Sequence, residues 1–340
     1  MNKKLSMKEI SKLSGVSIAT VSRVINGTGR FSLDTKRKVE AVINEYNYVP
    51  NMAARSLRKA SMPTIGVIVP DITNEFFSSM VLELQILLFE LQYSTIICNT
   101  NELIELEKEH LNFLLAQNVS GIIVISGNPS NIINDANIPI AFIDRKPYGI
   151  NMENRIIVES DNIKGGYLAG KELIELGCKK IAAIVDNRSY AAGMERYQGL
   201  MQAQIEMGIP IYDDLLIKIT DVGFKAGYEG VENLLAQSKD FDAMFCGTDM
   251  LALGVISALH DNGINVPKKV KVVGFDDISI AKYSFKPITT IRQDRKKIAK
   301  TTVDLLIKSI KKEEIESMHK ILDVELIPRR STRGKKDKSK

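Results

Sequence analysis

Short apolar runs alternate with stretches of helical periodicity over most of this 340-residue chain, from Thr64 onward. Apolar runs bounded by helices favour parallel sheets that are covered on both faces. About 270 residues of this pattern exceed what one sheet usually holds, so we expect an α/β fold with two doubly wound parallel lobes. The expected strands are Ile65–Val69, Ser94–Cys98, Gly121–Ile125, Ile140–Ile143, Ile181–Val185, Met244–Cys246 and Val270–Gly274. The expected helices are Phe76–Leu91, Leu103–Ala116, Lys164–Leu176, Glu195–Met207 and Met250–Asn262.

The two ends of the chain are much more basic than its middle. Residues 1–60 hold 12 Lys or Arg and 4 Asp or Glu, and residues 329–340 hold 7 and 1. The middle of the chain holds 27 basic and 36 acidic residues. Basic ends on an otherwise acidic chain predict a polyanionic partner there and a different task for the middle.

The first of the basic segments begins with two helix signals in close succession. Ser6 and Glu9 fit a capping box, in which each side chain accepts a hydrogen bond from an amide at the helix start. Gly15 permits a tight turn after this helix. Ser17 is then a second N-cap, ahead of a helix over residues 18–26.

A third helix is expected after Ser32. Three short helices with so tight a turn between the first two match a helix-turn-helix, whose second helix lies in the major groove of DNA. Any small helical bundle also has caps and exposed polar side chains, but the tight turn combined with the local positive charge favours DNA. The inner stripe of the third helix is expected to hold Val39, Val42, Ile43 and Tyr46.

The outer face of the second helix suits a DNA reader. Ile18 and Ala19 offer apolar contact to a thymine methyl group, and Arg23 can bind guanine through O6 and N7. Ser17 and Thr20 are better suited to phosphate oxygens. The expected DNA-binding residues of this region are Ser17, Ile18, Ala19, Thr20, Ser22, Arg23 and Asn26.

Two long motifs give this segment a specific resemblance. "TVSRVIN" in the second helix and "YVPNMAARSL" at residues 48–57 are typical of the LacI/GalR family of bacterial transcription repressors, which the head of this chain resembles. The resemblance implies a hinge helix, capped by Asn51, that folds only on operator DNA. It also implies that Leu57, with the small Ala54 beside it, wedges into the minor groove, where an apolar side chain can unstack a flexible step and kink the duplex.

The resemblance continues to residue 332 and implies the fold of periplasmic sugar-binding proteins, with an effector cleft between two lobes. In open parallel sheets, ligands bind at the carboxyl ends of the strands. Carboxylates accept from sugar hydroxyls, Arg side chains donate to them, and aromatic rings cover the apolar ring face. The expected effector-binding residues are Asn74, Phe76, Phe77, Asp144, Arg145, Arg196, Phe224, Thr248, Asp249, Asp276 and Gln293.

Several of these side chains also have simpler structural roles open to them. Asn74 and Asp249 can each cap the helix that follows, and Asp276 can turn the chain. Thr248 departs from the family pattern, because many sugar-binding members carry asparagine at this position. This departure leaves the identity of the effector open.

Nothing in the sequence predicts catalysis. The three histidines lie outside the expected strand-end loops, and no phosphate loop of the G-x-x-x-x-G-K type is present. Gly165 and Gly166 indicate close backbone packing rather than a nucleotide site. We expect no cofactor, no metal ion and no enzymatic activity. Reduced core thiols are expected at the cysteines, which lack metal-ligand spacing, namely Cys98, Cys178 and Cys246.

Three parts are therefore expected. Residues 1–60 form the DNA-binding head and hinge helix, residues 61–332 the two-lobed effector-binding and dimerisation domain, and residues 333–340 a basic tail. The N-terminus lacks the apolar core of a signal peptide, and no apolar run approaches the ~20 residues of a membrane span, so we expect a cytoplasmic protein without membrane contact. The tail lacks the apolar residues of a tetramer-forming helix, so we expect a homodimer on a near-palindromic operator.

The sequence thus predicts a DNA-binding transcriptional repressor whose operator affinity is controlled by a small effector, in the first instance a sugar. Two other functions stay open. One is a carbon-catabolite-type regulator with a phosphorylated carrier protein as corepressor. The other is a sugar sensor whose basic head serves RNA or a membrane surface.

Overall fold

The computed structural model describes residues 6–26, 29–46, 63–125, 137–144, 155–188, 192–237 and 240–334. The chain divides into two compact units, Met1–Met62 and Pro63–Lys340. The described residues do not include Asn51, Ala54, Leu57, Arg145 or the last six residues of the tail, nor the side chain of Asn26. The roles expected for these residues therefore stay predictions.

The first unit contains the three expected helices, α1 (Met7–Ser14), α2 (Ile18–Asn26) and α3 (Leu33–Glu45). Ser6 and Glu9 form the expected capping box, with the Ser6 amide donating to Glu9 Oε2 at 2.7 Å. Gly15 ends α1 in the left-handed region at φ 66°, where a glycine is favoured. The Ser17 hydroxyl accepts from the Thr20 amide at 3.2 Å and so caps α2.

A small apolar core holds the three helices of this unit together. Its buried members are Ile10 of α1, Val21 and Val24 of α2, and Val39 and Val42 of α3. The prediction that Tyr46 belongs to the inner face of α3 was wrong. Tyr46 follows the end of α3 and is 48% exposed, because the helix stops before another turn can direct this ring inward.

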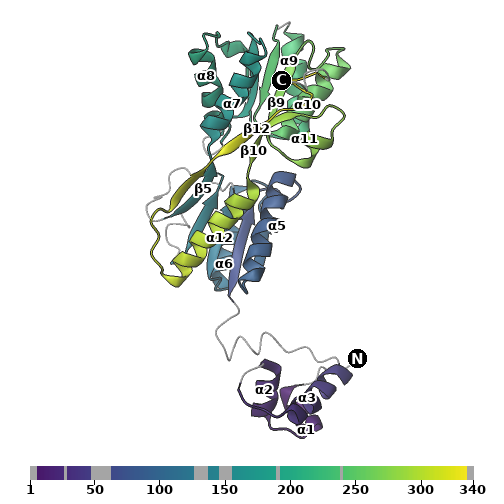
Figure 1. The fold of residues 1–340 in the computed structure, drawn as a ribbon, viewed down its shortest axis with the longest axis vertical. Coiled ribbons are helices and arrows are strands. Elements are labelled where there is room, and N and C mark those ends of the chain that lie inside the picture. Colours follow the sequence, from purple (N-terminus) through teal and green to yellow (C-terminus); the bar gives the residue numbers. More distant parts are fainter. Residues whose placement is uncertain are drawn as a thin grey trace. The chain divides into compact units, whose positions relative to one another are not determined.

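The second unit contains two six-stranded sheets, one in each lobe (Figure 1). The N-terminal lobe has a fully parallel sheet in the order β11-β5-β4-β3-β1-β2. Its strands are β1 (Thr64–Val69), β2 (Ser94–Asn99), β3 (Gly121–Ile125), β4 (Ile140–Ile143), β5 (Ile156–Ser160) and β11 (His319–Leu322).

The sheet of the C-terminal lobe has the order β12-β10-β9-β8-β6-β7. It is parallel except for the edge strand β12, which pairs antiparallel to β10. Its strands are β6 (Ile181–Asp186), β7 (Leu216–Ile219), β8 (Ala243–Cys246), β9 (Lys271–Asp276), β10 (Thr289–Gln293) and β12 (Val324–Ile327).

Helices cover both faces of each sheet, so the expected pair of doubly wound lobes is confirmed. In the N-terminal lobe, α5 (Glu75–Glu90) and α12 (Arg295–Lys311) pack on one face and α6 (Ile104–Ala116) on the other. In the C-terminal lobe, α7 and α8 pack on one face and α9 and α10 on the other. These helices and the short α11 are α7 (Asn162–Glu175), α8 (Gly193–Glu206), α9 (Phe224–Ala236), α10 (Asp249–Asp261) and α11 (Ser279–Tyr283).

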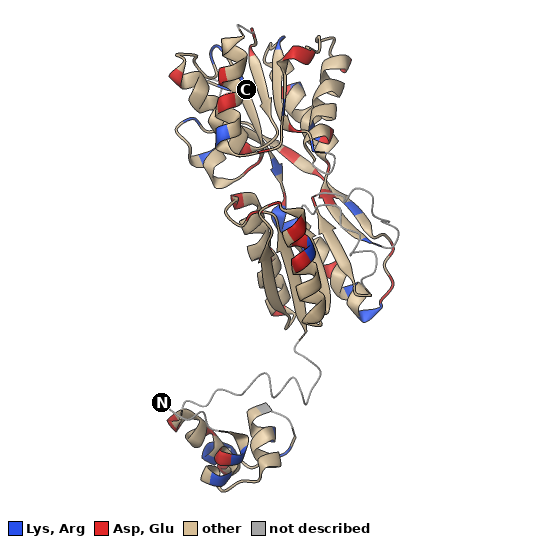
Figure 2. Cartoon of the chain, turned by 180° about the vertical axis from the view of Figure 1, so that it is seen from behind, with Lys and Arg blue, Asp and Glu red and all other residues tan. Residues whose placement is uncertain are grey.

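The chain passes between the lobes three times, after β5, after β10 and between β11 and β12. These crossings lie at the junction of the two lobes (Figure 1), where both acidic and basic residues are found (Figure 2). The carboxyl ends of β1 and β4 in one lobe and of β6, β8 and β9 in the other supply residues to one pocket at this junction. The crossings therefore connect the two halves of the candidate site.

Candidate functional site

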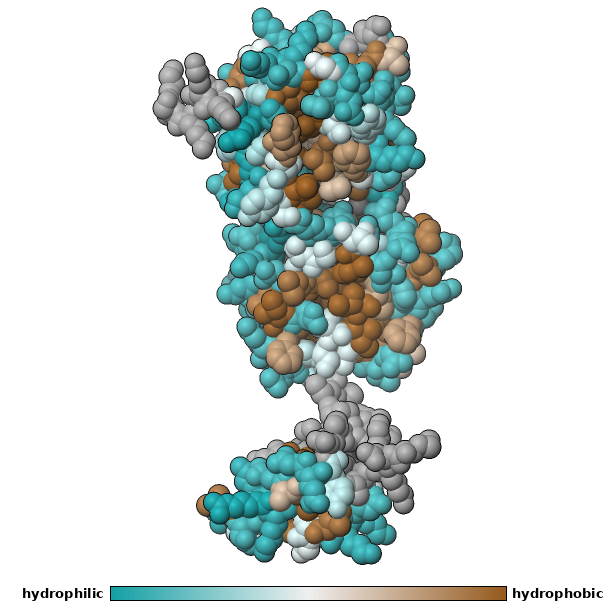
Figure 3. Space-filling model, turned by 90° about the vertical axis from the view of Figure 1, so that its right-hand side faces the viewer, coloured by the Kyte–Doolittle hydropathy of each residue, from teal (hydrophilic) through white to brown (hydrophobic). Residues whose placement is uncertain are grey.

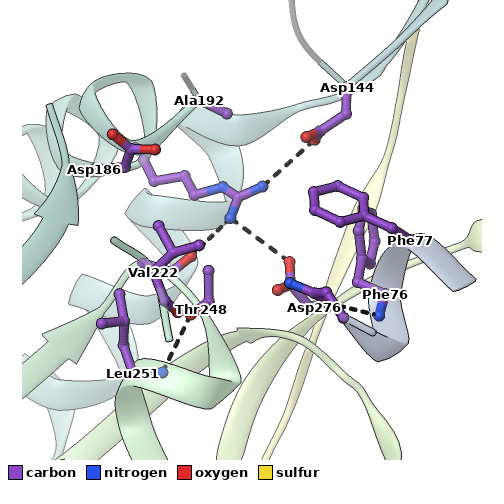
Figure 4. A pocket seen from close by; sticks show the side chains of 13 residues that line it. Phe76, Phe77, Asp144, Asp186, Ala192, Val222, Thr248, Leu251 and Asp276 are labelled. Atoms are coloured by element: carbon purple, nitrogen blue, oxygen red, sulfur yellow. Dashed lines mark hydrogen bonds and ion pairs between the residues drawn. The ribbon is translucent and has the colours of Figure 1, made fainter. Parts of the chain in front are cut away.

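A pocket lies between the two lobes of the second unit. Four of its residues come from the N-terminal lobe, and the rest come from the C-terminal lobe (Figure 4). Polar groups lie beside apolar ones in this lining, which is the usual character of a small-molecule site. The lining residues are Asn74, Phe76, Phe77, Asp144, Asp186, Ala192, Gly193, Arg196, Val222, Gly247, Thr248, Leu251 and Asp276.

Arg196 occupies the centre of the pocket and is almost fully buried. Its Nη2 lies 3.6 Å from Asp144 Oδ1 of the N-terminal lobe, and its Nη1 lies 3.6 Å from Asp276 Oδ1 of the C-terminal lobe (Figure 4). The guanidinium also stacks over the ring of Phe275, 3.8 Å from its centroid. Three of the charged residues expected to bind the effector, Asp144, Arg196 and Asp276, are thus brought together.

The position of Arg196 depends on close contact between α7 and α8. A Cβ on Gly166 would lie 1.8 Å from the Arg196 carbonyl oxygen, and a Cβ on Gly199 would lie 1.9 Å from the Ile163 carbonyl oxygen. Only glycine fits at such distances, so the expected role of Gly166 in backbone packing is confirmed. The Arg196 side chain also contacts α7 directly, because Asn162 Oδ1 accepts a hydrogen bond from Arg196 Nε at 2.9 Å. The sequence analysis missed Asn162, which at the start of α7 resembles an ordinary helix-terminal residue.

Asp144 follows the buried strand β4 and Asp276 is the last residue of the buried strand β9, and both have positive φ angles, 71° and 108°. Non-glycine residues in this region are uncommon and cluster at functional sites. Burial raises the pKa of Asp276 to about 7, with Arg196 opposing this effect and Asp144 adding to it. The pocket therefore holds a carboxyl group whose charge changes near neutral pH.

Asp249 and Thr248 have structural roles that limit what they offer a ligand. Thr248 lines the pocket, but its hydroxyl donates to the Val222 carbonyl at 3.1 Å and accepts from the Leu251 amide at 3.2 Å. It caps α10, which corrects the alternative that Asp249 does so. Asp249 is fully buried outside the lining, and its carboxylate accepts from the Ile278 amide at 3.0 Å.

Gln293 and Phe224 are not among the residues that line the pocket. Gln293 is buried behind Asp276 and donates from Nε2 to Asp276 Oδ1 at 2.8 Å, so it orients that carboxylate. Phe224 begins α9 and is 38% exposed. Asn74 lines the pocket, and its Oδ1 also caps α5 by accepting from the Phe76 amide.

The sequence analysis also missed Asp186, which lines the pocket at the end of β6. Its carboxylate accepts from Arg188 Nε at 2.9 Å, and Arg188 also pairs with Glu102 of the N-terminal lobe. An acidic residue directly after a buried strand was the available signal for Asp186. Asp186 is not among the effector-binding positions that the family resemblance implies, so it was not predicted.

The head unit presents the outer face of α2 as expected. Ile18 is 42% exposed, and Ala19 and Arg23 are also exposed, whereas Val21 and Val24 are buried. Ser22 is half-buried. The hydroxyls of Ser17 and Thr20 lie 2.9 Å apart at the start of the helix.

The cysteines are free and buried, and burial raises the pKa of each of their thiols, as expected of core thiols. Among the described residues, no cluster of His, Cys, Asp and Glu is arranged to hold a metal ion. Within the same ranges, no helix has the length and apolar character needed to cross a bilayer.

Two family models match this chain. Residues 6–51 match the bacterial regulatory proteins of the lacI family, and residues 171–332 match a periplasmic binding protein-like domain. Curated relatives match over nearly the whole length. The HTH-type transcriptional regulator RegA of Clostridium saccharobutylicum is 36% identical over 332 residues, which cover 96% of this chain and 99% of that relative. The HTH-type transcriptional repressor PurR of Actinobacillus pleuropneumoniae serotype 3 (strain JL03) is 32% identical over 335 residues, which cover 97% of this chain and 98% of that relative.

Solved structures agree with these matches. The lac repressor dimer bound to operator and the anti-inducer ONPF has a TM-score of 0.85 and 26% identity, and the match covers 97% of this chain and 99% of that one. The complex of the transcriptional regulator CelR with cellobiose has a TM-score of 0.74 and 28% identity, and the match covers 96% of this chain and 99% of that one. The helix-turn-helix head, the two parallel lobes and these full-length similarities lead to one conclusion: the chain belongs to the LacI family of bacterial transcriptional regulators.

Proposed function

We propose that this regulator is a repressor whose affinity for operator DNA is controlled by a small sugar bound between its two lobes. The observation that carries the proposal is the position of Arg196, held between Asp144 of one lobe and Asp276 of the other. A hydroxylated ligand at this point can contact both lobes at once. It therefore binds one relative position of the lobes better than another, which is the requirement for an effector.

The lining supports a sugar as the effector. Carboxylates accept hydrogen bonds from hydroxyls, the guanidinium donates to them, and Phe76 and Phe77 provide aromatic surface beside these polar groups (Figure 4). The structurally similar regulator CelR was solved as a complex with cellobiose. The protein acts in this proposal by binding and not by catalysis, in the cytoplasm, where its DNA is found.

The head is proposed to read the operator through the exposed face of α2. Arg23 contacts a guanine, Ile18 and Ala19 pack against thymine methyl groups, and Ser17 and Thr20 hold phosphates. Residues 1–60 form the head and hinge in this proposal, residues 61–332 the effector and dimerisation domain, and residues 333–340 a basic tail. The hinge segment, with Asn51, Ala54 and Leu57, links effector binding to DNA binding.

In the proposed homodimer, each protomer contributes one DNA-binding head. Exposed apolar side chains gather on one face of both lobes (Figure 3). The exposed apolar residues of the two lobes include Leu82, Ile86 and Phe89 of α5 and Phe285 after α11. Exposed apolar surface of this extent on a soluble domain indicates a protein contact. The relative named above, the lac repressor, was solved as a dimer on its operator.

The test has two stages. A thermal-shift screen of sugars against the purified chain identifies the effector, and titration of a duplex selected from a random library measures operator affinity with and without it. We expect one sugar both to stabilise the protein and to change operator affinity. The variant Arg196→Met should still bind the duplex but lose the response to the sugar. Absence of any change in operator affinity over the whole panel would contradict the proposal.

A further inference from the structure

A short segment of the C-terminal lobe, residues 276–279, enters the core of the N-terminal lobe. It begins with Asp276, which lines the effector pocket. Two residues later, Ile278 is buried in the same apolar core as the inner faces of α5 and α12, which belong to the N-terminal lobe. Ala281, only three residues further on, is buried in the core of the C-terminal lobe. A pocket carboxylate is therefore carried by a segment that is anchored in the opposite lobe.

Polar groups of the N-terminal lobe hold both ends of this segment. At the start of α12, Arg295 Nη1 donates to the carbonyl oxygens of Asp276 at 3.1 Å and of Asp277 at 3.3 Å. At the start of α5, the Glu75 carboxylate accepts from the amide and the hydroxyl of Ser279, each at 2.6 Å. The two helices that share a core with Ile278 thus also hold the backbone on either side of it.

The backbone of Asp276 and Asp277 lies in the left-handed region, with φ angles of 108° and 53°. Non-glycine residues persist at such angles only where the surrounding structure holds them there. The Asp277 carboxylate supplies part of this restraint, because it accepts from Arg292 Nε at 2.7 Å and pairs with Arg329. Arg295 supplies the rest through the two carbonyl oxygens. The direction of the Asp276 carboxylate therefore depends on a residue of the N-terminal lobe that is not part of the described pocket lining.

We infer that Arg295 is a positioning residue for the pocket carboxylate of Asp276, and that residues 276–279 transmit effector binding from the pocket to α12. The inference rests on the proposed function and adds to it the element that connects the two lobes. A ligand bound by Asp276 favours one position of that carboxylate, and the restrained backbone moves with it. Ile278 then shifts against the core that α12 shares with α5, and the helix responds as a unit because packed cores have discrete arrangements.

Arg295→Met tests the positioning role. Methionine keeps much of the aliphatic length but cannot donate to either carbonyl oxygen, so fewer molecules hold Asp276 in the binding position. Glucose, fructose, ribose, sucrose and cellobiose are the probes, and each is titrated calorimetrically into the full chain. For the probe that binds, we expect the dissociation constant to rise at least about tenfold in Arg295→Met and to stay within about threefold in Arg295→Lys, which keeps a donor.

The matched control for the lost charge is Lys296→Met, because Lys296 is exposed at the same end of α12. Its dissociation constant for the probe should equal that of the unaltered chain. An Arg295→Met protein that binds the probe as tightly as the Lys296→Met protein would overturn the positioning role.

Ile278→Ala tests transmission separately from binding. The substitution removes the contact with the core of the N-terminal lobe and keeps the backbone that Arg295 holds, so the dissociation constant for the probe should change less than about threefold. The effect of saturating probe on operator affinity, measured by fluorescence anisotropy, should fall at least about fivefold. The matched control Ile123→Ala removes the same atoms from β3 in the same core and should keep the effect. An effect of equal size in Ile278→Ala and Ile123→Ala would overturn the transmission.

Hydrogen exchange on the unaltered chain gives a test that requires no variant to fold. Binding of the probe should change amide protection in residues 276–279 and in the first two turns of α12, which supplies no residue to the described pocket lining. Helix α6, on the opposite face of the same sheet, should keep its protection. Unchanged protection in α12 would overturn the transmission.

The inference and the proposed function fail in different ways. If a probe binds the unaltered chain, Arg295→Met and Ile278→Ala equally well and changes operator affinity equally in all three, the repressor proposal survives and the inference is wrong. If no probe changes the operator affinity of the unaltered chain, the proposed function itself fails, and the inference fails with it.

Discussion

Arg188 of the C-terminal lobe reaches across the cleft to Glu102 of the N-terminal lobe, and its Nη2 donates to Glu102 Oε1 at 3.4 Å while Nη1 pairs with Oε2. The same guanidinium holds Asp186, which lines the effector pocket. A second link joins the lobes at α5, where Glu75 accepts from the amide and the hydroxyl of Ser279, each at 2.6 Å. The lobes are thus held together by side chains that lie beside the pocket.

Glu102→Gln should weaken effector binding. The substitution removes the charge that stabilises this relative position of the lobes, so part of the binding energy of the effector must be spent on closing them. We expect the effector dissociation constant to rise about three- to tenfold, since the pair is partly exposed and therefore partly screened. Isothermal titration measures the change. The control Glu105→Gln, an exposed acidic residue of α6, should behave like the unaltered chain, and equal affinities for all three proteins would contradict a role for the pair.

Arg23→Ala should relax sequence preference at one base pair in each half of the operator. A guanidinium bound to guanine O6 and N7 contributes about 1 to 3 kcal/mol of discrimination against other bases. Binding to duplexes substituted at each position in turn measures this preference, with the exposed Lys36→Ala as a control for the loss of one positive charge. Equal weakening on every duplex would show that Arg23 contacts phosphate alone.

Gly166→Ala should destabilise the protein and disturb the pocket together. The added Cβ would meet the Arg196 carbonyl oxygen at 1.8 Å, so α7 and α8 must move apart and displace the Arg196 side chain. We expect a loss of at least about 2 kcal/mol in unfolding free energy, measured by denaturant titration. Gly247→Ala is the matched control for stability, because a Cβ there would meet no atom nearer than 3.4 Å. A stable Gly166→Ala protein with unchanged effector affinity would be contrary to this account.

Asp276→Asn should change how stability depends on pH. The pKa of Asp276 is raised from 3.8 to about 7, so the folded state holds a proton that the unfolded state releases. Below about pH 4, Asp276 is protonated in both states and does not change the free energy of unfolding through its charge. Between about pH 4 and pH 7, ionisation in the unfolded state lowers the free energy of unfolding progressively. Above about pH 7 the loss is constant, at most ~4 kcal/mol. In melts across this range, the melting temperature of Asp276→Asn relative to the unaltered chain should rise with pH up to about 7 and then level off. A difference in melting temperature between Asp276→Asn and the unaltered chain that is the same at every pH would contradict the raised pKa of Asp276.

The local signals in the sequence were sufficient for much of the fold. Capping residues such as Ser6, Ser17 and Ser32 begin the three helices of the head as expected, because a cap depends only on residues close in sequence. Seven of the strands were predicted from their apolar runs, namely β1, β2, β3, β4, β6, β8 and β9. The other described strands, β5, β7, β10, β11 and β12, were not predicted. β5 and β10 are buried but include polar residues, β7 and β11 are short and partly exposed, and β12 alternates at the edge of its sheet.

Part of the candidate site was predictable from the family resemblance. Asp144 and Asp276 at strand ends and Arg196 in α8 were expected to bind the effector and lie in one pocket, although they come from three separate segments. The pair of Glu102 and Arg188 could not be predicted, since 86 residues separate its members and neither has a local signal. The hydrogen bond from the Thr248 hydroxyl to the Val222 carbonyl could not be predicted either, because Val222 belongs to a different loop.

Control of operator affinity by the effector is tested by measuring operator binding with and without the sugar. A labelled duplex that carries the selected operator, and a scrambled duplex of the same composition, are titrated with the full chain by fluorescence anisotropy at one fixed salt concentration. We expect strong preference for the operator and a change of about 5- to 150-fold in operator affinity when the sugar is added, with no change for the scrambled duplex. Equal affinity for the two duplexes, or an operator affinity that no sugar alters, would contradict this expectation.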